Sequence, residues 1–123
     1  MKKTNLGINR NIITVKADTS LHEAIRILAG NSTTSLPVVT NDMRLIGILS
    51  EKDLMKLLYN PNLNYKTVAD LMTRDIICFD VNTDLVEICK CLIEKDFRRV
   101  PIVSNGKFVG VISRKDIIKS LLL

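Results

Sequence analysis

The hydrophobic and polar positions of this chain run through the same order twice. Each copy opens with a short apolar run rich in β-branched residues, "IITV" at 12–15 and "IICF" at 76–79, which predicts a strand. Apolar residues three and four positions apart follow, and this spacing predicts a helix with one buried face. These positions are Leu21, Ile25 and Leu28 in the first copy and Leu85, Ile88, Cys89 and Leu92 in the second.

Two further apolar runs and a second helical pattern complete each copy. "LPVVT" and "VPIVS" carry a proline near the start, where a strand tolerates its missing N–H donor. The Asn-Gly pair at 105–106 predicts a tight hairpin to the returning strand. Ser20 with Glu23, and Asp84 with Glu87, are typical of helix N-caps. The predicted order is β-α-β-β-α, twice, which is an α+β fold.

The repeat extends over most of the chain. A shift of 64 residues carries Ile12 onto Ile76, and a shift of 63 carries Gly47 onto Gly110. Self-similarity on this scale indicates a duplicated supersecondary unit. Since two units are too few for a solenoid, we expect them to pair about a pseudo-two-fold axis, each covering the other's apolar side.

The most similar segments are "GILSEKDL" at 47–54 and "GVISRKDI" at 110–117. A serine three residues before an aspartate, after a strand, is typical of a helix N-cap. The same position has a second interpretation, because the N–H groups of a helix N-terminus favour phosphate. An ionised carboxylate there can accept hydrogen bonds from both vicinal hydroxyls of a ribose. The sequence leaves both interpretations open.

Composition narrows the class of protein. The 123 residues, 13.8 kDa, are enough for one compact domain. The net charge is +5, but the basic residues are scattered, so a nucleic-acid partner is disfavoured. We find no nucleophile–base pair, metal-type spacing or glycine-rich phosphate loop, and therefore predict neither catalysis nor a metal site. The three cysteines are predicted to be reduced core residues. No apolar run approaches eighteen residues, and we expect a cytoplasmic protein without a membrane segment.

Taken together, the tandem units resemble a cystathionine-β-synthase (CBS) domain pair, also called a Bateman module. The resemblance rests on "GILSEKD", "GVISRKD", "SLPVV", "RRVPIV" and "VADLMTRDIICF", and it covers about 12–122. It departs at the entry to the first copy, where "LGINRNIITV" replaces the Met-Thr approach of "LMTRDIICF". It implies one CBS-pair module over 1–123, with the first motif at 12–58, a linker at 59–75 and the second motif at 76–122.

The resemblance also implies a function. Such modules are non-enzymatic, need no cofactor, and bind AMP, ADP or ATP, sometimes S-adenosylmethionine, in clefts between the two units. Carried over residue by residue, one cleft would use Ile48, Ser50, Asp53, Ile77, Arg98, Arg99 and Pro101. The other would use Ile13, Thr34, Ser35, Pro37, Val111, Ser113 and Asp116.

Charge distinguishes the two implied clefts. Arg98 and Arg99 belong to the first, whereas the second has the hydroxyls of Thr34 and Ser35 at the matching positions. Charge-assisted hydrogen bonds contribute about 1.5–3 kcal/mol each, so we expect a phosphorylated ligand to prefer the cleft with Asp53. The alternative for the arginines is an exposed ion-pairing face.

We further expect a homodimer built on the apolar faces of "LMKLLY" and "IIKSLLL", and an unknown regulated protein as partner. Two alternative functions stay open. One is a ligand-free dimerisation or docking scaffold, and the other is a sensor of S-adenosylmethionine.

Overall fold

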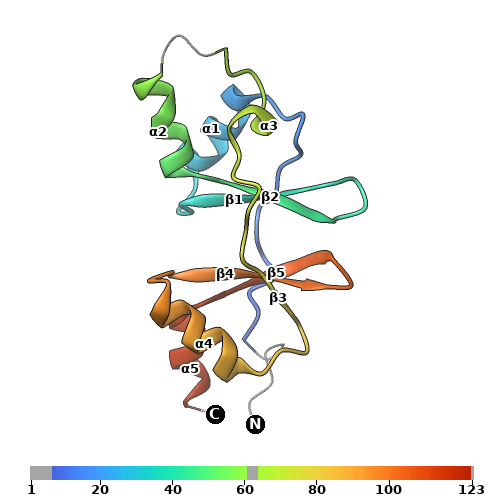
Figure 1. The fold of residues 1–123 in the computed structure, drawn as a ribbon, viewed down its shortest axis with the longest axis vertical. Coiled ribbons are helices and arrows are strands. Elements are labelled where there is room, and N and C mark those ends of the chain that lie inside the picture. The colour runs from blue at the N-terminus through green and yellow to red at the C-terminus, as the bar shows by residue number, and fades with distance from the viewer. Residues whose placement is uncertain (1–6, 61–63, 123) are drawn as a thin grey trace. The chain divides into compact units, whose positions relative to one another are not determined.

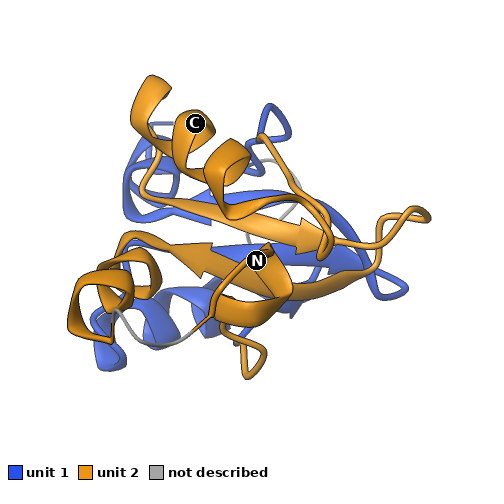
Figure 2. Ribbon diagram, turned by 90° about the horizontal axis from the view of Figure 1, so that it is seen from above, with its two compact units in different colours: residues 1–12, 77–123 blue, residues 13–76 orange. Residues whose placement is uncertain are grey.

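The computed structural model describes residues 7–60 and 64–122, in two compact units that Figure 2 colours separately. Unit 2 is Ile13–Ile76, and unit 1 combines Met1–Ile12 with Ile77–Leu123. The first copy of the repeat therefore lies in unit 2 and the second in unit 1. Each unit also takes up the segment that precedes the other copy in the sequence.

Unit 2 is built around an antiparallel hairpin. Its elements are α1 (Leu21–Gly30), β1 (Ser35–Val39), β2 (Leu45–Ser50), α2 (Glu51–Tyr59) and the short α3 (Val68–Leu71). Single bridges extend the hairpin on both edges: Val15 lies parallel to Val38, and Thr73 lies antiparallel to Ile48. Helices α1 and α2 lie on the same side of the hairpin (Figure 1).

Unit 1 repeats this arrangement. Its elements are β3 (Phe79–Asp80), α4 (Leu85–Glu94), β4 (Arg99–Ser104), β5 (Lys107–Ser113) and α5 (Arg114–Ser120). Strand β3 is parallel to β4, which is antiparallel to β5. Asn9 bridges the free edge of β5 at Val111, as Thr73 does on β2. The two helices again share one side of the sheet (Figure 1).

The expected β-α-β-β-α order is confirmed in the second copy, and in the first copy the opening strand is reduced to a single bridge at Val15. The first strand of each copy was therefore predicted too long. Of residues 12–15 only Val15 pairs, through Val15 N to Pro37 O at 3.0 Å and Val39 N to Val15 O at 2.9 Å. In the second copy the strand is only Phe79–Asp80. The apolar residues before Val15 and before Phe79 are not paired with β1 or β4. In each copy the chain reaches the edge of that strand only at the end of the predicted apolar run.

Each unit has its own aliphatic core between sheet and helices. In unit 2, Leu36, Val38 and Leu49 pack against the buried face of α1. In unit 1, Val100, Ile102 and Ile112 pack against the buried face of α4. The local signals are confirmed too: Ser20 Oγ accepts a hydrogen bond from Glu23 N, and Asn105 and Gly106 both have the positive φ of a tight hairpin turn.

The repeated glycines Gly47 and Gly110 allow an extra segment to approach the edge strand. A Cβ at Gly47 would lie 2.8 Å from Met72 Sδ and 3.0 Å from Thr73 O. At Gly110 it would lie 2.5 Å from Ile8 Cγ2 and would also meet the carbonyl oxygen of Asn9. In both units the glycine thus admits the segment that hydrogen-bonds to the next strand residue.

We predict that Gly110→Ala lowers the free energy of unfolding by about 1–3 kcal/mol, because the new methyl group would overlap backbone that cannot withdraw without losing the Asn9–Val111 bridge. Urea unfolding followed by circular dichroism measures it. Gly30→Ala is the matched control, since an added Cβ there has no atom within 4 Å. Equal stability of the two variants would contradict this explanation of the repeated glycine.

Candidate functional site

The candidate site in each unit starts where the second strand of the hairpin ends and the next helix begins, at β2 and α2 in unit 2 and at β5 and α5 in unit 1. In unit 2, Ser50 Oγ accepts a hydrogen bond from Asp53 N at 3.2 Å, and Asp53 Oδ2 accepts from Ser50 N at 2.9 Å and from Ser50 Oγ at 3.0 Å. In unit 1, Ser113 and Asp116 make the same three bonds at 3.1, 2.9 and 2.8 Å. Both Ser-x-x-Asp segments are reciprocal capping boxes, so the capping interpretation is confirmed.

The second oxygen of the two aspartates differs. Asp53 Oδ1 accepts a hydrogen bond from Thr73 Oγ1 at 2.9 Å and lies 3.4 Å from Lys56 Nζ. Asp53 is only 3% exposed. Asp116 is half-buried, and among residues 7–60 and 64–122 its Oδ1 has no corresponding donor.

Thr73 reaches Asp53 because α3 and the residues after it are held in place. Asp70 Oδ2 accepts hydrogen bonds from the backbone N–H groups of Lys66 and Thr67, at 2.9 and 3.0 Å, and so caps α3. These bonds, that from Thr67 foremost, hold the pKa of Asp70 below its ordinary value. Thr73 is then fixed on the edge of β2 by Ile48 N to Thr73 O and Thr73 N to Ile48 O, at 2.9 and 2.8 Å.

The predicted strand residues share the helix-free face of their sheets. Ser35 pairs in register with Ser50, and Pro37 with Ile48. Because side chains alternate along a strand, these four lie opposite the core residues Leu36 and Leu49. In unit 1 the equivalent set is Arg99 with Ser113 and Pro101 with Val111.

The remaining predicted residues lie beside these strands. Thr34 and Arg98 directly precede β1 and β4, and their carbonyl oxygens accept hydrogen bonds from the first residues of α2 and α5 at 3.0 and 2.9 Å. Ile13 and Ile77 occupy equivalent positions and are exposed apolar side chains, 43% and 39%. Exposed aliphatic side chains are available for contact with the face of a base.

Arg98 is exposed and Arg99 half-buried. Within the described part of the chain, neither guanidinium makes an ion pair or a side-chain hydrogen bond. The alternative interpretation, that these arginines form an ion-pairing face, therefore has no support in the residues described.

Each unit thus brings together its own part of the predicted residues. Unit 2 holds Ile13, Thr34, Ser35, Pro37, Ile48, Ser50 and Asp53, and unit 1 holds Ile77, Arg98, Arg99, Pro101, Val111, Ser113 and Asp116. The combination of residues from one unit with residues from the other, which the resemblance implies, stays a prediction. Sequence reasoning missed Thr73, although the Met-Thr of the second approach, absent from the first, was a signal at that position.

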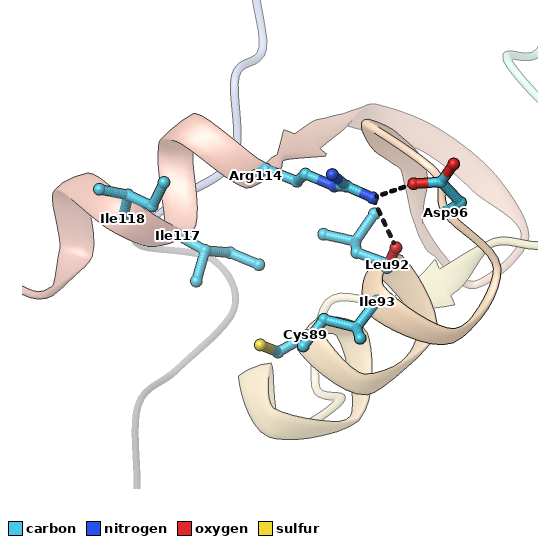
Figure 3. Close-up of a pocket in the computed structure, with 7 residues that line it drawn as sticks. All are labelled: Cys89, Leu92, Ile93, Asp96, Arg114, Ile117 and Ile118. Carbon is cyan, nitrogen blue, oxygen red and sulfur yellow. Dashed lines mark hydrogen bonds and ion pairs between the residues drawn. The ribbon is translucent and has the colours of Figure 1, made fainter.

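A pocket that the sequence did not predict lies between α4 and α5 of unit 1 (Figure 3). Its volume is about 390 Å³, and Leu92, Ile93, Ile117 and Ile118 give it an apolar lining. Arg114 lies at this pocket, donating to Leu92 O at 3.1 Å and pairing with Asp96 at 2.9 Å. Neither Ser113 nor Asp116 lines this pocket, although Arg114 stands between them in the sequence.

The cysteines are free thiols, but the prediction that they are core residues was wrong. Cys78 is exposed, and Cys89 and Cys91 are only half-buried, because they fall at the margins of the helix and strand faces that pack. Desolvation by neighbouring atoms raises the pKa of the Cys78 thiol above its ordinary value, which favours the protonated form. Within residues 7–60 and 64–122 we find no group of three His, Cys, Asp or Glu placed to hold a metal ion. No helix in those ranges has the length and apolar character needed to cross a bilayer.

Comparison with known proteins identifies the family. The model of the CBS domain matches residues 5–60 and again 68–123. This chain belongs to the CBS-domain family. Its two matches form a tandem CBS pair, and the predicted fold class is thereby confirmed.

Relatives and solved structures support this membership. The chain is 30% identical over 114 residues to the uncharacterized protein MJ1225 of Methanocaldococcus jannaschii, covering 93% of this chain and 41% of that protein. It is 31% identical to inosine-5'-monophosphate dehydrogenase of the same organism, covering 97% of this chain but 23% of the enzyme. The CBS pair thus spans less than half of either relative. The crystal structure of CBSX2 in complex with AMP superimposes with a TM-score of 0.89 and 28% identity, covering 99% of this chain and 97% of that one.

We predict that Asp70→Asn destabilises the protein at neutral pH but not in acid. A folded-state pKa below the ordinary value of 3.8 means that the Asp70 carboxylate stabilises the fold above that pH, and that this stabilisation is lost as pH falls through the folded-state pKa. The difference in urea midpoint between wild type and variant should stay constant well above pH 3.8 and shrink as the pH falls below that value. Glu94→Gln, at an exposed carboxyl in α4, is the control. A difference that is independent of pH would contradict the role given to the ionised carboxylate.

Proposed function

We propose that this CBS pair is a non-enzymatic regulatory module that binds an adenine nucleotide (AMP, ADP or ATP) and signals its presence to a partner protein. The observation that carries the proposal is the likeness, over nearly the whole chain, to a CBS-pair structure that holds AMP. The local chemistry is consistent with it. Each unit presents a serine, a carboxylate and helix N–H groups at the end of a strand, which is a combination that suits ribose and phosphate.

The proposed ligand contacts are those implied by the family. Asp53 or Asp116 would accept hydrogen bonds from ribose, and the aliphatic side chains of Ile13, Ile77 and Ile48 would contact adenine. The set containing Asp53, Arg98 and Arg99 is proposed as the preferred site for a phosphorylated ligand. Two guanidiniums that have no ion pair within the described part of the chain support this, because a charge-assisted bond to phosphate contributes about 1.5–3 kcal/mol.

The signal would be a population shift: a ligand with higher affinity for one conformation of the module favours the surface which that conformation presents. Self-association belongs to the same proposal. Exposed apolar side chains on α2 and α5 support it, including Met55 and Leu58 on α2 and Ile118 on α5. Large exposed apolar side chains gathered on one element are typical of an interaction surface.

A ligand-free scaffold and an S-adenosylmethionine sensor are the competing functions. A purely structural protein does not require polar groups that lack partners, and this disfavours the scaffold. Among the residues described, such groups are Asp116 Oδ1 and the guanidiniums of Arg98 and Arg99. The sulfonium ligand is disfavoured at the arginine-bearing site, because a cation there would face two like charges.

We predict that AMP, ADP or ATP raises the melting temperature by several degrees. A ligand present at a hundred times its Kd adds about 2.7 kcal/mol to the free energy of unfolding, provided that it binds only the folded state. Differential scanning fluorimetry against AMP, ADP, ATP, S-adenosylmethionine and NAD measures it. If S-adenosylmethionine alone shifted the melting temperature, the sensor alternative would replace this proposal. If none of the five did, the scaffold would.

We predict further that the double substitution Arg98→Ala, Arg99→Ala weakens AMP binding at least tenfold and leaves adenosine binding within about twofold, because only the phosphate is lost as a partner. Isothermal titration calorimetry with both ligands measures the two affinities. Lys107→Ala, which removes one exposed cation at the start of β5, is the control for a general effect of lost positive charge. Similar losses for AMP and adenosine, or an equal loss of AMP affinity in the control, would contradict the assignment.

A further inference from the structure

The two Ser-x-x-Asp carboxylates differ at Oδ1, where Asp53 accepts hydrogen bonds from Thr73 Oγ1 at 2.9 Å and from Lys56 Nζ at 3.4 Å, and this difference bears on how each receives a ligand. We propose that the Thr73 hydroxyl is a latch on Asp53: it occupies the carboxylate oxygen that a ribose would use and so sets the affinity of that site for sugar hydroxyls. This proposal rests on the proposed function, since it concerns the same ligand. Asp116, which has no such latch, would accept ribose hydroxyls directly.

The number of hydrogen bonds that a carboxylate can accept limits what Asp53 can bind. Two oxygens offer about four lone-pair positions. Asp53 uses two on Oδ2, for Ser50 N and Ser50 Oγ, and its Oδ1 faces Thr73 Oγ1 at 2.9 Å and Lys56 Nζ at 3.4 Å. A ribose with two vicinal hydroxyls therefore finds this carboxylate occupied, and at least the Thr73 bond has to break before both can bind.

The second copy serves as an internal control on what Thr73 does. Asp116 has the same two bonds to Ser113 N and Ser113 Oγ, in the same capping box. It keeps this orientation although its Oδ1 has no donor within residues 7–60 and 64–122. The serine alone is thus sufficient to orient the carboxylate. Thr73 is therefore not needed to position Asp53, and what it adds is occupancy of Oδ1.

The shorter of the two bonds to Asp53 Oδ1, the one from Thr73 Oγ1, depends on a single position in the sequence. Thr73 and Asn9 hold equivalent places, each exchanging two backbone hydrogen bonds with the edge strand, at Ile48 and Val111 respectively. Asn9 directs its side chain elsewhere, because its Oδ1 accepts a bond from Asn11 N at 3.1 Å. The backbone that would deliver a latch is present in both units, but only unit 2 carries the hydroxyl.

This latch opposes the effect of the arginines. The site proposed to favour a phosphorylated ligand through Arg98 and Arg99 carries the occupied carboxylate, whereas Asp116 is the open one. Affinity at the Asp53 site would then depend on phosphate more than on sugar. The Asp116 site would depend on sugar more than on phosphate.

The test compares AMP with 2′,3′-dideoxyadenosine monophosphate, which lacks the hydroxyls that the carboxylate would accept. In an Asp116→Ala background, Thr73→Val is expected to tighten AMP binding about three- to tenfold and to leave the dideoxy nucleotide within twofold. Thr73→Ser, which retains the hydroxyl, should bind AMP as the background does. Isothermal titration calorimetry of the background, Thr73→Val and Thr73→Ser with both nucleotides gives the affinities.

The reciprocal arm introduces a latch into unit 1. In an Asp53→Ala background, Asn9→Thr should weaken AMP binding by a similar factor, again with the dideoxy nucleotide unchanged. If Asp53→Ala does not fold, as judged by circular dichroism, Asp53→Asn replaces it, because the amide oxygen can still cap α2. An unchanged AMP affinity in Asn9→Thr would overturn the claim that this one position decides.

The outcomes distinguish a failure of the Thr73 latch from a failure of the proposed function. Weaker AMP binding in Thr73→Val, or equal changes for both nucleotides, would overturn the latch while leaving the proposed function intact. If wild-type protein bound none of the adenine nucleotides, the proposed function would fail first, and the latch with it.

Discussion

The reciprocal hydrogen bonding of a serine and an aspartate at the end of a strand is the interaction on which each unit depends. It directs the chain from the hairpin into the helix that follows, α2 or α5, and satisfies N–H groups that a helix start leaves unpaired. It also fixes the carboxylate at the margin of the sheet. The same residues are thus needed for folding and proposed for binding. In unit 1 the serine alone orients the carboxylate proposed for binding, since no other hydrogen bond to the Asp116 side chain is found among residues 7–60 and 64–122.

Duplication preserved this frame and allowed the surroundings to diverge. The glycine that admits the edge segment, the proline on the inner strand and the capping box occur in both copies. What differs is the charge and hydrogen bonding around them: Arg98 and Arg99 stand where the first copy has Thr34 and Ser35. Because the backbone is held by elements common to both copies, such side chains can change without disturbing the fold, and the two units acquire different chemistry.

Much of this was predictable because the signals are local. The helical periodicity, the capping residues and the Asn-Gly turn each act over a few residues, and the order of elements follows from them. The lengths of the first strands were not predictable in this way, because pairing depends on where the chain meets its neighbour and not on its own composition. The bond between Thr73 and Asp53 spans twenty positions and comes from an edge segment whose register only the structure fixes. The pairing of site residues from different units is a prediction of the same non-local kind, which rests on family resemblance.

Arg114 has a consequence for Arg98, which directly precedes β4, and for Arg99, the first residue of that strand. Its guanidinium donates to the carbonyl oxygens of Leu92 and Phe97, and its own N–H donates to Arg98 O at 2.9 Å, so the turn after α4 is tied to the start of α5. In the first copy the corresponding residue is Glu51, which cannot make these side-chain bonds. The backbone that carries Arg98 is therefore held in place by hydrogen bonds within unit 1. An anion arriving there would have only two side chains to immobilise, and not a mobile loop, which reduces the entropy lost on capture.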